Sequence, residues 1–174
     1  WLDSFFNNPG IYEIEMGTPM KKIFGEIGGG YKEPVKAFQI GGPLGGVVPL
    51  SEIDNLNLDF QEFSAKGFML GHASVVSIPK DFPMTEYIHH LFEFSAEESC
   101  GKCFPGRLGS YRGKEMFDQF KNKTAKIPLK LLNELLVTMQ KGCVCALCGA
   151  IPTPIMNILK YFGDEMKNDM VKDN

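Results

Sequence analysis

The cysteines of this chain constrain its fold more than any other feature, because all five lie in two short groups that are far apart in the sequence. Cys100 and Cys103 form the first group, and Cys143, Cys145 and Cys148 form the second. Packing does not require such clustering, whereas four soft thiolates are typical ligands of zinc or of an iron–sulfur cluster. The fold is therefore expected to bring the two groups together around a metal, and the spacing alone does not choose between these two.

The cysteine count also indicates the redox environment. An odd number of cysteines at tight spacing does not fit the disulfide framework of a small secreted domain. No apolar run reaches the roughly 18 residues of a membrane span, and the sequence has no signal peptide. We therefore expect a reducing compartment, either the cytoplasm or the cytoplasmic face of a membrane complex, with no direct membrane insertion.

Length and charge set further bounds. A chain of 174 residues fits one domain or two small ones, and 44% hydrophobic residues are enough to bury a core. The formal net charge of −3 gives no reason to expect nucleic acid as a partner. Because the chain begins at Trp1 rather than at methionine, we expect it to be a piece of a longer protein or a processed product.

Residues 1–83 show the patterns of a small α+β unit. Alternating or β-branched apolar residues predict strands at residues 11–16, 35–40 and 73–78. Thr18 and Pro19 are a typical N-cap and first residue of a helix, which the glycines at 28–30 would end. A short helix is also expected at residues 59–66. Short strands around one main helix are typical of a β-grasp domain.

A glycine-rich loop, Gly41-Gly42-Pro43-Leu44-Gly45-Gly46, follows the second predicted strand. Such a loop can hold phosphate when it opens a helix. Neither the Lys-Ser/Thr of a Walker loop nor a clear helix follows it, so both nucleotide-binding motifs lack their context. A loop that needs close backbone approach or positive φ is the favoured interpretation.

Residues 84–174 change to helical periodicity and predict a four-helix bundle. The four helices are expected to begin near Met84, near Pro105, at Pro128 and at Thr153-Pro154, and Gly142 is the expected stop of the third. Their apolar stripes include Ile88, Leu91, Phe92, Leu108, Tyr111, Phe117, Phe120, Leu132, Leu136, Met139, Ile155, Ile158 and Phe162. The fold class is therefore α+β, a small β-grasp domain followed by a helical bundle.

Other polar residues give weaker signals. His89 and His90 are adjacent on the first helix and diverge by about 100°, so they cannot both face one metal, and surface positions are favoured for them. The acidic pair Glu97-Glu98 fits a solvated helix end better than an acid–base pair. Arg107 and Arg112 are the two arginines of the chain, and both follow the first cysteine pair. This fits either a partly buried anion there or chance in a lysine-rich composition.

Two cysteine pairs share the same C-x2-C spacing between predicted helices. Cys100 and Cys103 precede a helix, whose N-terminus would stabilise thiolate charge together with Arg107. Cys145 and Cys148 lie between the third and fourth helices and offer a matching pair. A self-contained thiol oxidoreductase is disfavoured, because the βαβ context of such enzymes is missing.

The sequence resembles a known family at four places. The run ESCGKCFPGRLGS at residues 98–110 resembles the ESCGxCxPCRxG motif of the NADH-oxidising flavoprotein subunit of respiratory complex I, which has relatives in NAD-reducing hydrogenases and NAD-linked formate dehydrogenases. CALCGAIPTP at residues 145–154 is similar to the family's C-x-L-G-x-x-x-P-x-P. PGIYEIEMGTP at residues 9–19 and QIGGPLGG at residues 39–46 resemble its soluble-ligand-binding β-grasp domain and its GGPSGG loop.

The resemblance implies an architecture and a role. It implies a soluble-ligand-binding β-grasp domain at 1–83 and an iron–sulfur helical bundle at 84–174. The bundle would carry one 4Fe-4S cluster that relays electrons from flavin mononucleotide, which NADH reduces in a preceding domain. Cys100, Cys103 and Cys145 match three cluster ligands, and Arg107 matches the arginine beside the cluster. The implied partners are other subunits of a multi-subunit oxidoreductase, including another iron–sulfur subunit, and this chain alone is not expected to oxidise NADH.

This sequence departs from the family motif at two positions. The third cysteine of the motif is Gly106 here, and glycine cannot ligate iron. The glycine after C-x-L is Cys148 here, which makes Cys148 a candidate replacement ligand, with Cys143 as another candidate. A three-iron cluster, a non-protein ligand, zinc and no metal are further alternatives. If Cys148 compensates, Cys148→Ser should abolish cluster assembly and Gly106→Cys should rescue it.

Two functional hypotheses follow. The first is an electron-transfer module that binds its cluster through Cys100, Cys103, Cys145 and Cys148. The second is a non-redox structural, docking or ligand-binding module, in which the cysteines bind zinc or no metal. Iron and sulfide content, together with electron paramagnetic resonance of the reduced protein, distinguishes the two.

Overall fold

The computed structural model describes residues 1–171. The chain divides into two compact units, Trp1–Phe82 and Pro83–Asn174, and each is described by itself. The first contains a three-stranded antiparallel sheet and the second is mainly helical, so the fold class is α+β.

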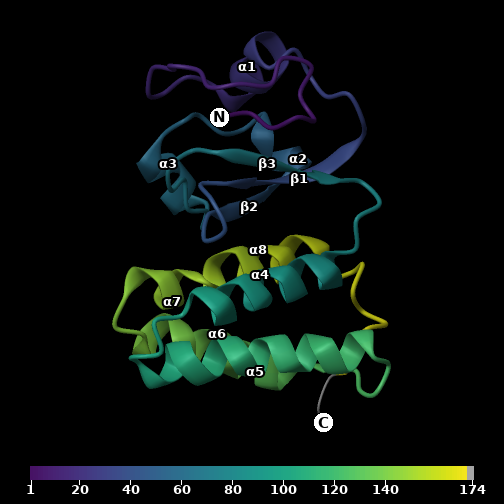
Figure 1. Ribbon diagram of the computed structural model, residues 1–174. Helices are drawn as coiled ribbons and strands as arrows, with labels where there is room; N and C mark the ends of the chain where they lie inside the picture. The colour runs from purple at the N-terminus through teal and green to yellow at the C-terminus, as the bar shows by residue number, and fades with distance from the viewer. Residues whose placement is uncertain (172–174) are drawn as a thin grey trace. The chain divides into compact units, whose positions relative to one another are not determined.

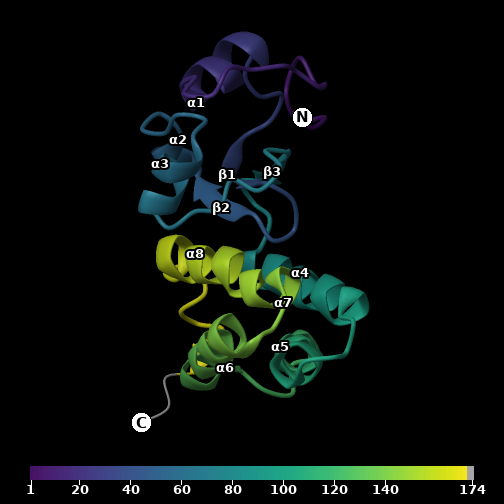
Figure 2. The ribbon, with the colours of Figure 1, turned by 90° about the vertical axis from the view of Figure 1, so that its left-hand side faces the viewer.

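The sheet of the first unit has β1 at its centre. Its strands are β1 (Val35–Ile40), β2 (Gly46–Pro49) and β3 (Val75–Pro79). Both neighbours pair antiparallel with β1, in the order β2-β1-β3 (Figure 2). The predicted strands at 35–40 and 73–78 are confirmed, whereas sequence patterns missed the short β2.

The first unit also contains short helices. They are α1 (Met20–Lys22), which continues as the π-helix η1 (Ile23–Ile27), α2 (Leu50–Ile53) and α3 (Phe60–Ala65). Pro19 rather than Thr18 is the N-cap of α1, because the Thr18 hydroxyl donates instead to the Glu15 carbonyl at 2.7 Å. A cluster of aromatic rings forms the core: Phe6, Phe24, Tyr31 and Phe38.

The predicted strand at residues 11–16 is wrong. This segment forms no ladder with the sheet, and Ile11 is 88% exposed. The alternating side chains Tyr12, Ile14 and Met16 instead line an apolar pocket, together with His72 and Ala73. A strand needs a free sheet edge as well as the right alternation, and β3 pairs here with Leu2 instead.

The glycine-rich loop has a structural role. Gly41 has φ of +101°, and an ideal Cβ on it would lie 2.3 Å from the Leu70 carbonyl oxygen. Gly42 also has positive φ, at +88°. Close backbone approach and positive φ therefore explain these glycines, which agrees with the interpretation favoured from the sequence.

The described part of the second unit, residues 83–171, contains five helices and one small sheet. The helices are α4 (Met84–Glu98), α5 (Phe104–Lys121), α6 (Leu129–Gly142), α7 (Ala146–Ala150) and α8 (Pro152–Phe162). Strands β4 (Ile127–Pro128) and β5 (Met170–Val171) pair in parallel. The four predicted helices correspond to α4, α5, α6 and α8, and α7 is an additional turn of helix between the last two.

Helix α5 packs closely because it carries a face of buried glycines. Gly106, Gly109 and Gly113 recur at helical spacing and are all buried. An ideal Cβ on Gly113 would lie 2.2 Å from the Phe92 ring of α4, and one on Gly109 would lie 2.8 Å from Cγ of Met139 in α6. Because these residues have no side chains, α5 can approach both neighbours closely. A larger residue at these positions would overpack a filled core, which is unfavourable.

This packing brings the two cysteine segments together. The α4–α5 connection and the α6–α7 connection lie at the same end of the helices, at the left in Figure 1. Within residues 1–171, no helix combines the length and apolar character that crossing a membrane demands.

Candidate metal centre

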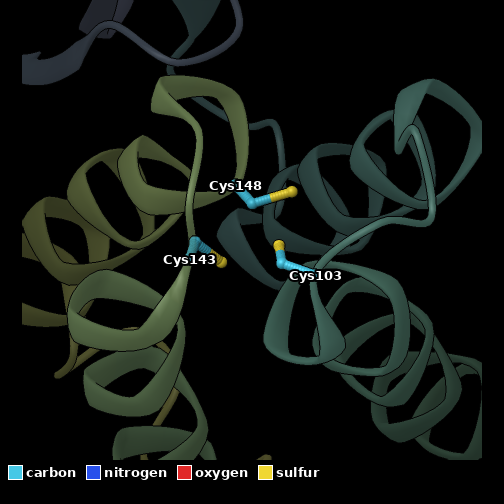
Figure 3. A group of neighbouring side chains, drawn as sticks. All are labelled: Cys103, Cys143 and Cys148. Atoms are coloured by element: carbon cyan, nitrogen blue, oxygen red, sulfur yellow. The ribbon is translucent and has the colours of Figure 1, made fainter.

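Three thiols converge from three different elements of the helical unit. Cys103 is the N-cap of α5, Cys143 is the C-cap of α6, and Cys148 lies within α7. Their Sγ atoms all lie within 4.8 Å of one another and are turned toward a common space (Figure 3). The group joins the two cysteine segments, as the clustering in the sequence predicts.

The predicted ligand set of Cys100, Cys103, Cys145 and Cys148 overlaps with this group in two members. Cys103 and Cys148 belong to it, whereas Cys100 and Cys145 are exposed and lie outside it. Cys145 is nevertheless close, because its thiol forms a hydrogen bond with the thiol of Cys148. Cys100 and Cys145 therefore remain ligands that are predicted from the sequence.

Cys143 is the member of the group that the ligand set left out. It was one of two candidates for the missing ligand, and the structure places its thiol beside Cys103 and Cys148. The signal in the sequence was its position immediately after Gly142, where α6 ends. A helix end directs the chain back toward the neighbouring helix, so a side chain at the C-cap can face α5.

Gly106 lies in the first turn of α5 and is directed at the same space. The residue is buried, and an ideal Cβ on it would lie 2.5 Å from Cys148 Sγ and 2.8 Å from Cys103 Sγ. Real Cβ atoms essentially never approach another heavy atom so closely. The space that a side chain at position 106 would need is therefore occupied by these two sulfurs.

The local backbone favours negative charge on Cys103. Hydrogen bonds from the backbone of Val144 and of Gly106 lower the pKa of the Cys103 thiol. The N-terminus of α5 adds the positive end of the helix dipole at the same position. Cys103 is therefore the thiol of this group best prepared to act as a thiolate.

The other two thiols are held in the neutral form when no cation is bound. Burial, followed by hydrogen bonding to Cys103, raises the pKa of Cys143 to about 12. Burial, followed by the nearby charge of Cys145, raises the pKa of Cys148 to about 11. A bound cation would reverse this preference, because it supplies the charge that burial removes.

The remaining predicted residues differ in their position. Arg107 is exposed in the first turn of α5, and its Cδ lies 3.8 Å from an ideal Cβ on Gly101, so its side chain lies along the Cys100–Cys103 loop. Arg112 forms an ion pair with Glu115. His89 forms a hydrogen bond of 2.7 Å with Asp118 and so links α4 to α5. His90 is exposed, as expected for a surface histidine.

The residues present fit a thiophilic cofactor. Cysteine thiolates are the protein ligands of iron–sulfur clusters, and they also bind zinc. The group is partly buried, backbone hydrogen bonds reach Cys103, and the thiol of Cys145 lies beside that of Cys148. Such hydrogen bonds and burial are the features by which proteins tune the potential of a cluster.

Comparison with known proteins also points to an iron–sulfur site in the helical unit. The protein-family model for the NADH-ubiquinone oxidoreductase-F iron–sulfur binding region matches residues 86–169. The chain is 30% identical over 161 residues to the NADP-reducing hydrogenase subunit HndC of Solidesulfovibrio fructosivorans, covering 91% of this chain and 33% of that protein. It is 28% identical over 170 residues to the mitochondrial NADH-ubiquinone oxidoreductase 51 kDa subunit of Neurospora crassa, covering 95% of this chain and 34% of that protein.

The fold has a counterpart among solved structures. The chain aligns with the crystal structure of an NAD+-reducing NiFe hydrogenase in the H2-reduced state at a TM-score of 0.84 and 20% identity, covering 99% of this chain and 29% of that chain. The chain thus spans about a third of the length of the two curated relatives named above. Residues 86–169 therefore belong to the family of the NADH-ubiquinone oxidoreductase-F iron–sulfur binding region.

Proposed function

We propose that this chain is an electron-relay module that binds one 4Fe-4S cluster at the end of its helical unit. The observation that carries the proposal is the convergence of Cys103, Cys143 and Cys148 within 4.8 Å, in a region that matches an iron–sulfur binding family. The proposed ligands are Cys100, Cys103, Cys145 and Cys148. When bound, such a cluster accepts and donates single electrons.

The residues of the chain hold and tune the cofactor rather than make or break bonds. The backbone of Val144 and of Gly106 stabilises charge on the sulfur of Cys103, and the N-terminus of α5 adds to this. Burial of Cys148, 1% exposed, keeps water from one side of the site. We assign to Arg107 a role beside the cluster, because its exposed side chain lies along the Cys100–Cys103 loop and carries a permanent positive charge.

The finer architecture and the setting are part of the same proposal. The first unit would be a soluble-ligand-binding β-grasp domain, supported by its three-stranded sheet and its short helices. The second would be a four-helix bundle formed by α4, α5, α6 and α8, with the cluster at one end. The relatives are named as subunits of an NADP-reducing hydrogenase and of an NADH-ubiquinone oxidoreductase. These names support a place in a multi-subunit oxidoreductase. As further parts of the proposal, the chain would lie at the cytoplasmic side, and flavin mononucleotide and NAD(H) would bind outside these 174 residues.

One experiment tests the relay. The purified chain is reconstituted anaerobically with iron and sulfide, and its iron, its sulfide and the electron paramagnetic resonance spectrum of the reduced form are measured. Four irons and four sulfides per chain with a reduced-cluster signal are expected for a 4Fe-4S cluster. Colourless protein without iron or sulfide after reconstitution would overturn the proposal.

A second candidate function is a zinc-binding structural module. Four thiolates around one tetrahedral zinc ion, with Zn–S of about 2.3 Å, stand about 3.8 Å apart. The three thiols, all within 4.8 Å of one another, approach this spacing. Stoichiometric zinc in the purified chain, without visible absorption and without displacement by iron and sulfide, would favour this function over the relay.

A further inference from the structure

We infer that Cys148 of α7 occupies the ligand position that residue 106 of α5 vacates, so that residues 106 and 148 form one exchangeable ligand position. The inference rests on the proposed cluster, and it concerns which residue supplies one of its ligands. The observation behind it is the direction of Gly106, whose ideal Cβ points at the sulfur of Cys148.

In the observed conformation, a side chain at 106 and the thiol of Cys148 would occupy the same space. An ideal Cβ on Gly106 meets Cys148 Sγ at 2.5 Å, Cys103 Sγ at 2.8 Å and Cys148 Cβ at 3.1 Å. A sulfur attached to that Cβ would extend further into the same space. Cys148 is 1% exposed, so its thiol lies inside the unit rather than in solvent.

The same measurement favours Cys148 over Cys143 as the replacement. Both thiols are within 4.8 Å of Cys103, so proximity alone does not separate them. The three atoms nearest to the Cβ position of Gly106 belong to Cys148 and Cys103, and none belongs to Cys143. Cys148 therefore takes the vacated position, and Cys143 borders the site from the C-terminus of α6.

The two departures from the family motif then have a single cause. The motif has cysteine at the position of Gly106 and glycine at the position of Cys148, and this chain has the reverse arrangement. Exchanging both residues keeps one thiol in the shared space, whereas changing one leaves either two thiols or none. This also modifies the rescue expected from the sequence. Serine at position 148 keeps the Cβ that lies 3.1 Å from the Cβ position of Gly106, whereas glycine removes it, so the rescue by Gly106→Cys is tested with glycine at 148.

The test compares four variants with the unmodified chain under identical anaerobic reconstitution. They are Cys148→Ala, the matched control Cys143→Ala, Cys148→Gly, and the double variant Gly106→Cys/Cys148→Gly. Iron and sulfide per chain and the resonance spectrum of the reduced form are measured, and far-ultraviolet circular dichroism of each variant without metal reports folding. We expect at least a fivefold loss of 4Fe-4S content in Cys148→Ala and Cys148→Gly, and at least half of the wild-type content in both Cys143→Ala and the double variant.

Each result decides the question. Full cluster content in Cys148→Ala, or loss in Cys143→Ala with retention in Cys148→Ala, overturns the inference while the proposed function stands. If Cys148→Ala does not fold, the test compares Cys148→Gly with the double variant. These two differ only at residue 106, and equal cluster content in them overturns the inference. A wild-type chain that takes up no iron or sulfide overturns the proposed function and this inference with it.

Discussion

Gly106 and Cys148 share one space at the junction of α5 and α7. An ideal Cβ on Gly106 would lie 2.5 Å from the sulfur of Cys148, so the absence of a side chain at 106 is what permits a buried thiol at 148. Gly109 and Gly113 extend the same face of α5 toward Met139 and Phe92. The glycines of α5 thus serve both its helix packing and the thiol site.

Gly106→Ala should therefore destabilise the chain without metal. The added methyl group must displace Cys148, and overpacking of this kind costs about 1–3 kcal/mol in free energy of unfolding. The measurement is urea unfolding followed by circular dichroism. Gly25→Ala is the matched control, because nothing lies within 4 Å of an ideal Cβ on Gly25 and its helical backbone should gain up to about 1 kcal/mol. Equal effects of the two substitutions would contradict the crowding at Gly106.

Asp118→Asn should destabilise the helical unit at neutral pH but not in acid. The hydrogen bond from His89, supported by Lys114, lowers the pKa of Asp118. A carboxyl group whose pKa is lower in the folded state stabilises it above the unfolded pKa of about 4, and this contribution is lost as the pH falls through the folded value. Because Asp118 is 40% exposed, solvent screening limits the loss at pH 7 to about 0.5–1 kcal/mol.

The measurement for Asp118→Asn is the free energy of unfolding at pH 7 and in acid. The difference in free energy of unfolding between Asp118→Asn and the unmodified chain should shrink as the pH falls below about 4. Glu115→Gln is the matched control, because the ion pair of Glu115 with Arg112 is exposed on both sides and contributes less. A difference that grows with acidification would show that the sign of the Asp118 contribution is wrong.

The thiols should react in a fixed order in the reduced chain without metal. Backbone hydrogen bonds lower the pKa of Cys103, whereas burial raises that of Cys143 to about 12 and that of Cys148 to about 11. Since the thiolate is the nucleophile, Cys103 should be alkylated by iodoacetamide at neutral pH before Cys143 and Cys148. Peptide mass spectrometry over time measures this order. The denatured chain is the control, in which the three should react at similar rates, and early modification of Cys148 in the folded chain would contradict its burial.

The loaded chain should unfold at a higher temperature than the chain without metal. A cofactor that binds only the folded state adds to stability, and a gain of about 1 kcal/mol or more raises Tm of a chain of 174 residues by about 2 °C or more. Calorimetry of the reconstituted and untreated forms measures the shift. In Cys103→Ala the shift should disappear, because Cys103 is central to the thiol group. If the iron-loaded wild-type chain had an unchanged Tm, this would contradict a cofactor site that exists only in the folded state.

Much of the local structure was predictable because it depends on neighbouring residues. Apolar periodicity located α4, α6 and α8 and the strands β1 and β3. It also located α5, but Leu108 and Tyr111, which were placed in its apolar stripe, are exposed. The strand expected at residues 11–16 failed, because alternation describes two faces but cannot supply a sheet edge to pair with. The short elements β2 and α7 escaped notice, since four or five residues carry too little periodicity.

The sequence by itself determined that the thiols belong to two segments, that one ligand position of the family motif is empty at Gly106, and that the chemistry is that of soft thiolate ligands. Only the tertiary structure decided which thiols face one another. Cys103 and Cys148 converge together with Cys143, and Gly106 points at Cys148, because these directions follow from the close packing of α5 against α6 and α7. Helix crossing sets the direction of a side chain in space, and spacing along the chain does not contain it.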